Sequence, residues 1–302
     1  MEINKDDANG LKHIKAKSIL HYHKQTFATN WDANIYRGCK HNCKYCFAQY
    51  SHRYLGTRDF FSDIYVKSNA PELLIKELNK KKWEGYPVNV CGISDCYQPA
   101  EEEYKIMPKV IKSFIATKNP IVIMTKSTLI LRDLELIKKL NKVAEVSIMI
   151  SVSTLNEDRR KLIEPNAAPT IERMQMLKTF SDLGFKTSIL FMPIIPYISD
   201  DEKNMDEIFR ITKEYNLGSI TTYPLHLRGN TKKIFYKFLK DSFPELLPKY
   251  EVLYNKNEVS KEYSINLQEK VNALRKKYQL FNTYRPSKPK LKQEKQSSLL
   301  DH

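Results

Sequence analysis

The chain has 302 residues, 41% hydrophobic and 28% charged, which is an ordinary globular composition and excludes a fibrous or wholly disordered protein. No stretch reaches the roughly 18 consecutive apolar residues of a membrane span, and the polar start MEINKDDANG is unlike a signal peptide. We therefore expect a cytoplasmic protein with no membrane partner. The net charge of +15 favours anionic partners, including nucleic acid, although a genomic bias toward lysine would give the same charge.

Short apolar runs alternate with amphipathic segments from residue 28 to residue 230, after a polar N-terminal arm (1–27). The runs predict strands at 34–36, 64–67, 88–93, 121–124, 146–152, 187–191 and 219–224. The amphipathic segments predict helices at 69–82, 107–117, 131–142, 170–183 and 201–215. Strands that alternate with helices build right-handed βαβ units and a parallel sheet. About six units, fewer than the eight of a closed barrel, predict an α/β fold, a partial (βα)6 TIM-type barrel.

The pattern changes after residue 230. Residues 231–284 predict a helical C-terminal extension in which aromatic residues and lysines interleave, as in Lys233, Phe235, Tyr236, Lys237 and Phe238. This pattern favours an amphipathic helix packed on the barrel over a surface that stacks bases. Residues 285–302 are rich in Pro, Lys, Gln and Ser and predict a basic, disordered tail.

Three of the five cysteines lie in one short run, YRGCKHNCKYCFAQY, directly after the first expected strand. Cys39, Cys43 and Cys46 have the spacing C-x3-C-x2-C, which lets one loop present three thiolates to a soft metal centre. A four-iron cube held by three thiolates keeps one iron open for a small molecule. Tyr45, just before the third cysteine, also fits an iron–sulfur site.

A structural zinc is the alternative for this loop, with His41 or His52 as the fourth ligand. Zinc loops usually match one Cys pair with a second pair elsewhere. The remaining cysteines, Cys91 and Cys96, stand on and after a strand expected to be buried. The pattern therefore favours iron and sulfur over zinc.

The loop resembles that of the radical S-adenosylmethionine (SAM) enzymes. Further stretches resemble, in order and spacing, the spore photoproduct lyase-like branch, also called DNA-repair-photolyase-like: VKSNAPELL, GISDCYQPAEEEY, IMTKSTLILRDLELI, VSIMISVSTLNEDRRKLIEPNAAPTIERM and FMPIIPYISD. They cover most of residues 34–200. The resemblance implies a [4Fe-4S] cluster and S-adenosyl-L-methionine, which one electron cleaves to methionine and a 5′-deoxyadenosyl radical. It also implies an electron donor such as a flavodoxin or ferredoxin.

The resemblance implies which residues meet the cluster and the cofactor. Cys39, Cys43 and Cys46 would bind the cluster. The cofactor would be met at strand ends: its amino group by Ser94 and Asp95, its carboxylate by Lys126, its ribose by Ser151 and Ser153, and its adenine by Met192, Pro193 and Ile194. Each of these could instead be a strand-end cap or a packing residue.

Other residues have less direct counterparts in the branch. Glu164 and Arg173 are expected to form a structural ion pair, and Arg228 either meets an anionic substrate or lies on the surface. Cys91 and Cys96 are candidate hydrogen-atom donors to a product radical, although buried cysteines usually fill space. The segment CYQPAEEEY departs from spore photoproduct lyase, so the resemblance implies a lyase-like radical enzyme acting on an unspecified substrate, with nucleic acid as one candidate. The alternative function is a non-catalytic nucleic-acid-binding protein whose cysteine loop holds a structural metal.

Overall fold

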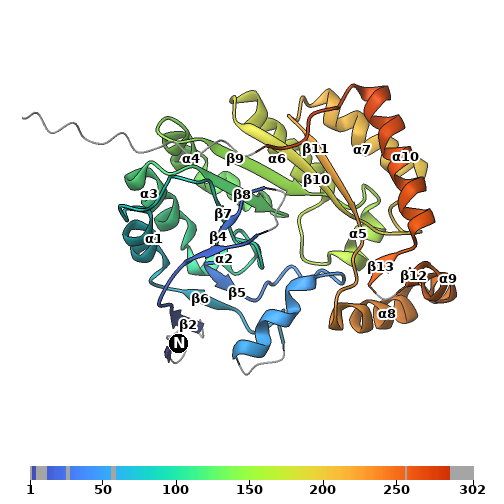
Figure 1. The fold of residues 1–302 in the computed structure, drawn as a ribbon, viewed down its shortest axis with the longest axis horizontal. Helices are drawn as coiled ribbons and strands as arrows, with labels where there is room; N and C mark the ends of the chain where they lie inside the picture. Colours follow the sequence, from blue (N-terminus) through green and yellow to red (C-terminus); the bar gives the residue numbers. More distant parts are fainter. Residues whose placement is uncertain (1, 5–11, 25–27, 56–58, 256, 286–302) are drawn as a thin grey trace, which may run out of the picture.

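The computed structural model describes residues 2–4, 12–24, 28–55, 59–255 and 257–285 (Figure 1). The expected disordered tail, apart from Arg285, lies outside these residues, as does part of the expected N-terminal arm. No helix in the described part of the chain is long and apolar enough to span a bilayer.

A 7-stranded sheet forms the body of the molecule, in the order β11-β10-β9-β8-β7-β4-β3 (Figure 1). All neighbours from β4 to β11 pair in parallel, and only β3 at the edge is antiparallel. This is the expected partial TIM-type barrel. Its strands are β3 Leu20–Tyr22, β4 Trp31–Ala33, β7 Val88–Val90, β8 Ile121–Thr125, β9 Val146–Ser151, β10 Lys186–Ile194 and β11 Ile220–Pro224.

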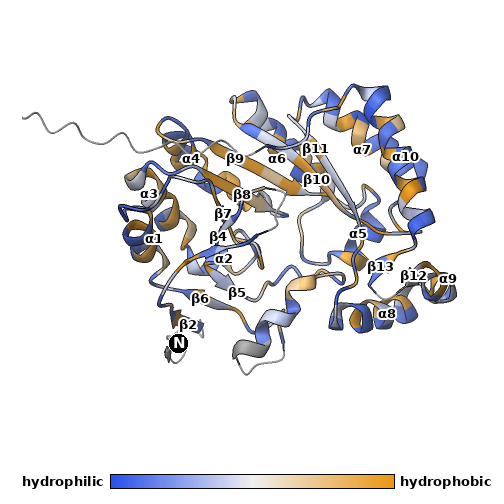
Figure 2. Ribbon diagram, in the orientation of Figure 1, coloured by the Kyte–Doolittle hydropathy of each residue, from blue (hydrophilic) through white to orange (hydrophobic). Residues whose placement is uncertain are grey.

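Helices cover the outer face of the sheet, with their apolar sides turned inward (Figure 2). Residues of β8 to β10 alternate between two environments, as strand geometry requires: Ile123 and Ile148 join the core shared with the helices, whereas Val122 and Met149 join a separate cluster inside the barrel. The covering helices are α1 Ala70–Leu78, α3 Met107–Thr117, α4 Leu134–Asn141, α6 Thr170–Asp182, α7 Glu202–Glu214 and α10 Lys261–Tyr278. Each fully buried aliphatic or aromatic side chain contributes about 1.5–3 kcal/mol.

The first barrel strand is not where the sequence pattern put it. The expected strand at 34–36 is wrong: β4 ends at Ala33, and β5 Tyr36–Arg37 pairs with β6 Tyr65–Lys67 in a separate four-stranded sheet of order β1-β2-β6-β5. The chain leaves the barrel sheet at Asn34, whose side chain instead accepts the Ile93 amide at 3.1 Å. The expected strand at 64–67 therefore exists, but outside the barrel. The other two strands of the small sheet are β1 Glu2–Asn4 and β2 Lys12–Lys15.

Two expected helices have different limits. The helix expected at 69–82 ends at Leu78, before three consecutive lysines. The helix expected at 131–142 begins earlier, as a 3₁₀ turn at Thr128–Asp133 that Ser127 caps by accepting the Leu129 amide. Polar residues at these ends interrupt the apolar period that predicts helix length.

The C-terminal region packs α8 Asn230–Ser242 and α9 Leu247–Leu253 beside the open end of the barrel (Figure 1). Phe235 and Phe238 are buried, as an amphipathic helix requires. A short hairpin of β12 Tyr254–Asn255 and β13 Glu258–Val259 then leads to α10. After α10, Tyr284 enters the bottom of the barrel, where its hydroxyl donates to Ser147 at 3.2 Å.

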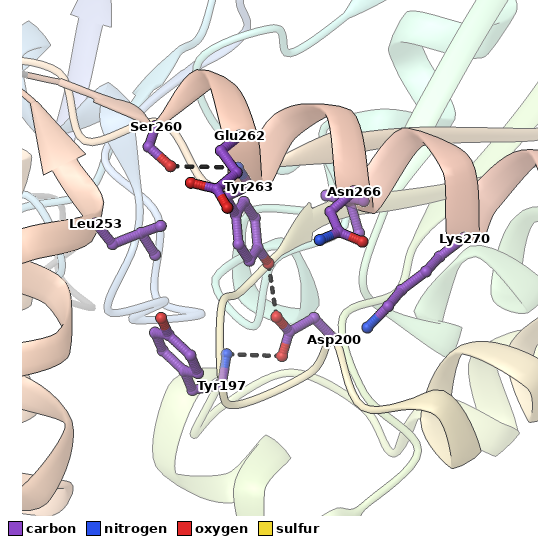
Figure 3. Close-up of a pocket in the computed structure, with 9 residues that line it drawn as sticks. Tyr197, Asp200, Leu253, Ser260, Glu262, Tyr263, Asn266 and Lys270 are labelled. Carbon is purple, nitrogen blue, oxygen red and sulfur yellow. Dashed lines mark hydrogen bonds between the residues drawn. The ribbon is translucent and has the colours of Figure 1, made fainter.

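A hollow of about 470 Å³ lies where α10 meets the loop after β10 (Figure 3). The Tyr263 hydroxyl donates to Asp200 at 2.7 Å, and Asp200 also accepts the Tyr197 amide at 2.6 Å. These hydrogen bonds within the protein fix α10 against the barrel. The hollow shares no residue with the cysteine loop.

Lys67 gives the small sheet a testable pH dependence. It is 3% exposed, and burial followed by repulsion from Arg37 lowers its pKa to about 8 from an ordinary 10.5. The folded state then loses this proton before the unfolded chain does, so stability rises as the pH increases from about 8 to 10.5. We expect Lys67→Met to raise the free energy of unfolding at pH 7 by about 2 kcal/mol, an advantage that fades by pH ~10.5.

Urea titrations at several pH values measure this difference. The exposed Lys82→Met is the matched control and should change stability by less than about 0.5 kcal/mol at each pH. Parallel pH profiles for Lys67→Met and the wild type would show that burial of the Lys67 ammonium does not lower the free energy of unfolding.

Candidate functional site

The cysteine loop and the carboxyl ends of the barrel strands enclose a cavity of about 490 Å³. In parallel α/β folds, functional residues gather at this end of the strands. Most of the residues singled out in the sequence line the cavity: Cys39, Cys43, Cys46, Cys91, Ser94, Asp95, Lys126, Ser151, Met192, Pro193 and Arg228. Cys96, Ser153 and Ile194 do not line it.

The cysteine loop starts at a tight turn. Gly38 has φ +84°, and a Cβ there would lie 2.6 Å from the Asp63 carbonyl oxygen, so only glycine fits. The Cys39 amide then donates to the Phe60 carbonyl at 3.1 Å. Burial raises the pKa of the Cys39 and Cys46 thiols, and raises the pKa of Cys43 to about 12. The thiols therefore keep their protons in the metal-free protein, and metal binding would release them.

Neither histidine near the loop is placed as a fourth zinc ligand. His41 directs one ring nitrogen to Asp95 at 3.0 Å and the other to the Asn166 carbonyl at 3.1 Å. His52 directs Nε2 to the Asp63 carbonyl at 2.8 Å. Among the described residues, no three His, Cys, Asp or Glu side chains are arranged around a single ion. A cube needs no such convergence, because each thiolate binds a different iron.

Asp95 joins three loops at the edge of the cavity. Its carboxylate accepts the His41 ring at 3.0 Å, the Thr125 hydroxyl at 2.8 Å and the Lys126 amide at 2.7 Å. Burial alone would raise the pKa of Asp95, but His41 and these hydrogen bonds hold it below its usual value. Asp95 is therefore an anion that ties the cysteine loop to the ends of β7 and β8.

Two polar groups in the cavity wall have unused hydrogen-bonding capacity. The Ser94 hydroxyl oxygen is buried without a hydrogen-bond partner among the described residues. The Lys126 ammonium makes no hydrogen bond or ion pair within the described chain and lies 5.9 Å from the centre of the Tyr45 ring. Buried polar groups normally find partners. A cation that faces the cavity suits a ligand with a carboxylate, and a hydroxyl oxygen beside it can accept a hydrogen bond from the amino group of that ligand.

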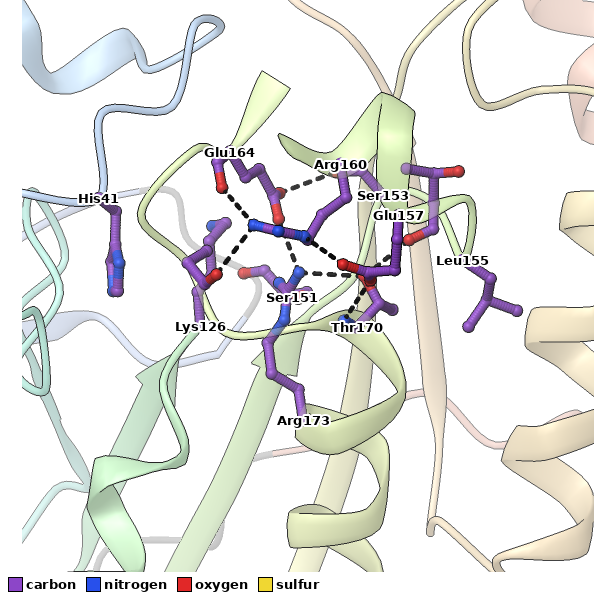
Figure 4. A network of polar contacts seen from close by, with 12 residues as sticks. His41, Lys126, Ser151, Ser153, Leu155, Glu157, Arg160, Glu164, Thr170 and Arg173 are labelled. Carbon is purple, nitrogen blue, oxygen red and sulfur yellow. Dashed lines mark hydrogen bonds and ion pairs between the residues drawn. The ribbon is translucent and has the colours of Figure 1, made fainter. Parts of the chain in front are cut away.

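Glu164 and Arg173 form the expected ion pair at 2.8 Å, with both side chains wholly buried (Figure 4). Burial would raise the pKa of Glu164, yet Arg173 and then Lys126 hold it down at about 2. The Ser153 hydroxyl donates to Glu164 at 3.2 Å, which explains why Ser153 faces away from the cavity. Tyr45 also donates its hydroxyl to Glu164.

The two remaining cysteines occupy different layers. Cys91 lines the cavity and has φ +68°, a left-handed conformation that is uncommon for a residue with a side chain. Cys96 is fully buried and does not line the cavity; burial, and then the neighbouring Cys91, raise the pKa of its thiol. Only Cys91 has direct access to a ligand in the cavity.

Several lining residues were not anticipated from the sequence, namely Met124, Leu190, Tyr223 and His226. Met124 precedes Lys126 by two residues, and Leu190 precedes Met192 by two. Side chains two apart on a strand share a face, so this spacing could have identified both. Tyr223 and His226 follow no comparable pattern, because β11 runs into an irregular loop.

Comparisons with known proteins show the family of the chain. The model of the Radical SAM superfamily matches residues 33–209, and the chain belongs to that superfamily. An uncharacterized protein of Mycobacterium tuberculosis (strain ATCC 25618 / H37Rv) is 31% identical over 264 residues, covering 86% of this chain and 77% of the relative. An uncharacterized protein of Methanocaldococcus jannaschii is 29% identical over 264 residues, covering 87% and 93%.

Solved structures share the fold. A spore photoproduct lyase double mutant with bound AdoMet and dinucleoside spore photoproduct has a TM-score of 0.68 at 16% identity, covering 89% of this chain and 78% of that one. Streptococcus suis SuiB, bound to the precursor peptide SuiA, has a TM-score of 0.54 at 15% identity, covering 84% and 47%. At these identities the likeness is one of fold alone.

Membership of the Radical SAM superfamily defines the class of this protein. The chain is a radical SAM enzyme, a class that uses a [4Fe-4S] cluster and S-adenosylmethionine and needs a reductant. A purely structural role for the metal and a non-catalytic protein, the alternatives open from the sequence, are therefore set aside. The cavity fits the cofactors, because it combines three thiols of one loop with the unpartnered Ser94 hydroxyl and the Lys126 ammonium.

Proposed function

We propose that Cys39, Cys43 and Cys46 hold the [4Fe-4S] cluster and that S-adenosylmethionine binds beside it, for hydrogen abstraction from a substrate at the cavity mouth. The observation that carries this proposal is the shared cavity, which brings the thiols of one loop to the ends of five strands, β7 to β11. When bound, the cluster and cofactor supply a 5′-deoxyadenosyl radical by one-electron cleavage of the sulfonium.

The residues of this chain bind and orient the cofactor. Lys126 would pair with its carboxylate, because the ammonium has no other hydrogen-bond acceptor among the described residues. Ser94 and Asp95 would receive the amino group, and Ser151 the ribose. Met192 and Pro193 would pack on adenine. Ser153 and Ile194, which lie outside the cavity lining, would support this wall from behind.

The deep wall of the cavity is apolar. Met124, Leu190 and Met192 line it below the level of Lys126. Such a wall excludes water and so protects a reactive carbon radical from side reactions. Cys91, at the same wall, is the thiol that could return a hydrogen atom to a product.

For the substrate we propose nucleic acid, because the rim of the cavity combines aromatic and basic groups. Phe47 and Tyr223 are 52% and 54% exposed, and Arg228 lies on the same lining. Exposed aromatic rings can stack on bases while arginine holds phosphate. The net charge of +15 supports the same class of substrate.

For the reductant we propose a small one-electron protein such as a flavodoxin or ferredoxin. Lys40 and Lys44 are two partly exposed cations of the cysteine loop: Lys40 pairs with Glu103 at 3.6 Å, whereas Lys44 contacts only the neutral Asn42 side chain, at 3.2 Å, among the described residues. Cationic groups next to the cluster would favour an acidic donor.

The cysteines are tested by iron content. Replacing any one of Cys39, Cys43 and Cys46 by Ala should abolish the four-iron cluster and 5′-deoxyadenosine formation while the protein still folds, because two thiolates cannot hold the cube. Iron analysis and chromatography after anaerobic reconstitution measure both. Cys96→Ala, outside the cavity, should retain full iron. An iron-replete, active loop variant would refute the assignment.

Lys126 is tested by cofactor affinity. Lys126→Met should weaken S-adenosylmethionine binding about tenfold to a hundredfold with the cluster retained, because a charge-assisted hydrogen bond contributes roughly 1.5–3 kcal/mol. Anaerobic calorimetry measures the Kd. The exposed Lys142→Met serves as control and should bind like the wild type. An unchanged Kd for Lys126→Met would assign Lys126 to structure.

The nucleic-acid substrate is tested by salt dependence. The logarithm of the affinity should fall linearly with the logarithm of salt, and Arg228→Ala should reduce the slope by about one contact. A chain ending at Arg285 should retain most of the binding, because residues 286–302 carry only four basic and two acidic residues. Lys178→Ala, on the outer face of α6, is the control. A nucleic-acid affinity that does not change with salt concentration, or a salt slope that Arg228→Ala leaves unchanged, would indicate another substrate class.

A further inference from the structure

The segment 163–168 contacts the cysteine loop at several residues between Lys40 and Tyr45, and we call it the clasp. Two backbone hydrogen bonds join them, from the Lys44 amide to the Ile163 carbonyl at 2.9 Å and from the Asn166 amide to the His41 carbonyl at 3.3 Å, and the His41 ring lies 3.1 Å from the Asn166 carbonyl. The Asn166 side chain adds a bond to the Lys40 carbonyl at 2.7 Å. Residues more than a hundred positions apart are thus joined at several points.

The clasp also contacts the backbone of Lys126, whose ammonium lines the cavity. The Ala168 amide donates to the Lys126 carbonyl at 3.1 Å, while the Lys126 amide donates to Asp95. The clasp itself is stiffened by Arg160, which donates to the carbonyls of Glu164 and Ala167 at 2.8 and 2.9 Å (Figure 4). The backbone of Lys126 is therefore held on both sides.

Glu164 is the charged centre of the clasp. Its carboxylate is fully buried and meets Arg173, the Ser153 hydroxyl and the Tyr45 hydroxyl. An ion pair with Arg173 alone would satisfy its charge. The bond to Tyr45 instead connects this pair to the cysteine loop, and the Tyr45 ring lies 5.9 Å from the Lys126 ammonium. One chain of contacts thus runs from Arg173 to Lys126.

We propose that Glu164 is a positioning residue: through the Tyr45 hydroxyl it holds the cysteine loop and places the Tyr45 ring beneath the Lys126 ammonium before any cofactor binds. This proposal rests on the proposed function, in which Lys126 receives the cofactor carboxylate. The face of an aromatic ring attracts a cation. The Tyr45 ring therefore fixes the position of the Lys126 ammonium in the cofactor-free protein. Pre-formed geometry lowers the cost of ordering groups on binding.

The test uses two variants that act on the same hydrogen bond: one removes its donor, and the other replaces the charged acceptor by a neutral amide oxygen, which weakens the bond. Tyr45→Phe removes only the hydroxyl, and Glu164→Gln removes the charge. Each should weaken S-adenosylmethionine binding to the reconstituted protein about tenfold with iron content retained. The double variant should bind more tightly than the product of the two single effects predicts, because Glu164 acts on the loop through the Tyr45 hydroxyl. If Tyr45 instead touched the cofactor directly, the two effects would multiply.

A second measurement does not need the cofactor. In the metal-free protein, hydrogen exchange of the cysteine-loop amides, including that of Lys44, should speed up about tenfold in Tyr45→Phe. Tyr250→Phe is the matched control: Tyr250 is fully buried and donates to the Pro196 carbonyl at 2.7 Å in the C-terminal region. It should lower the Tm similarly but leave loop exchange and cofactor Kd unchanged.

The outcomes separate the two proposals. If the wild type fails to bind S-adenosylmethionine, the proposed function is wrong, and loop exchange still decides whether Glu164 holds the loop. If the wild type binds but Tyr45→Phe matches it in Kd and exchange, the positioning role of Glu164 is overturned. Should Glu164→Gln fail to fold because Arg173 is left unpaired, Tyr45→Phe decides alone.

Discussion

Buried carboxylates hold an irregular loop in place, and the site depends on this arrangement. A loop of three thiols without helix or strand has few backbone hydrogen bonds of its own, so its conformation must be fixed from outside. Asp95 supplies one anchor through His41, and Glu164 supplies another through Tyr45. Burying two anions is costly unless each is fully hydrogen-bonded, and here each one has several donors.

The periodic parts of the fold were predictable from sequence. Strands such as β8 and β9 are mainly β-branched and apolar, and α3 begins and ends where its pattern does. The first barrel strand was missed because β4 is three residues long and contains Asp32, whose side chain is instead satisfied by Asn89 at 3.0 Å. A strand that short and that polar has no local signature.

The candidate site followed from motif and strand-end position, and Lys126 and Ser94 both line the cavity. Position along the chain did not reveal which way each side chain points. Ser153 turns toward Glu164, and Ile194 is fully buried away from the lining. The contacts of the clasp were also hidden, because hydrogen bonds such as Asn166 to Lys40 join residues 126 positions apart and leave no local pattern.

Tyr284 has a consequence for the order of events. It is 8% exposed in the bottom of the barrel, beside Val122, Met149 and Leu190, with the Lys186 ammonium 4.9 Å from its ring centre. Within the described residues the floor of the cavity is therefore filled, and ligands enter and leave through the rim near Phe47 and Tyr223. Ligands that enter through the same opening must bind one after another. If the substrate is nucleic acid, as proposed, a long polymer lying across that rim would close it, and the small cofactor would then enter before the substrate and its fragments would leave after it.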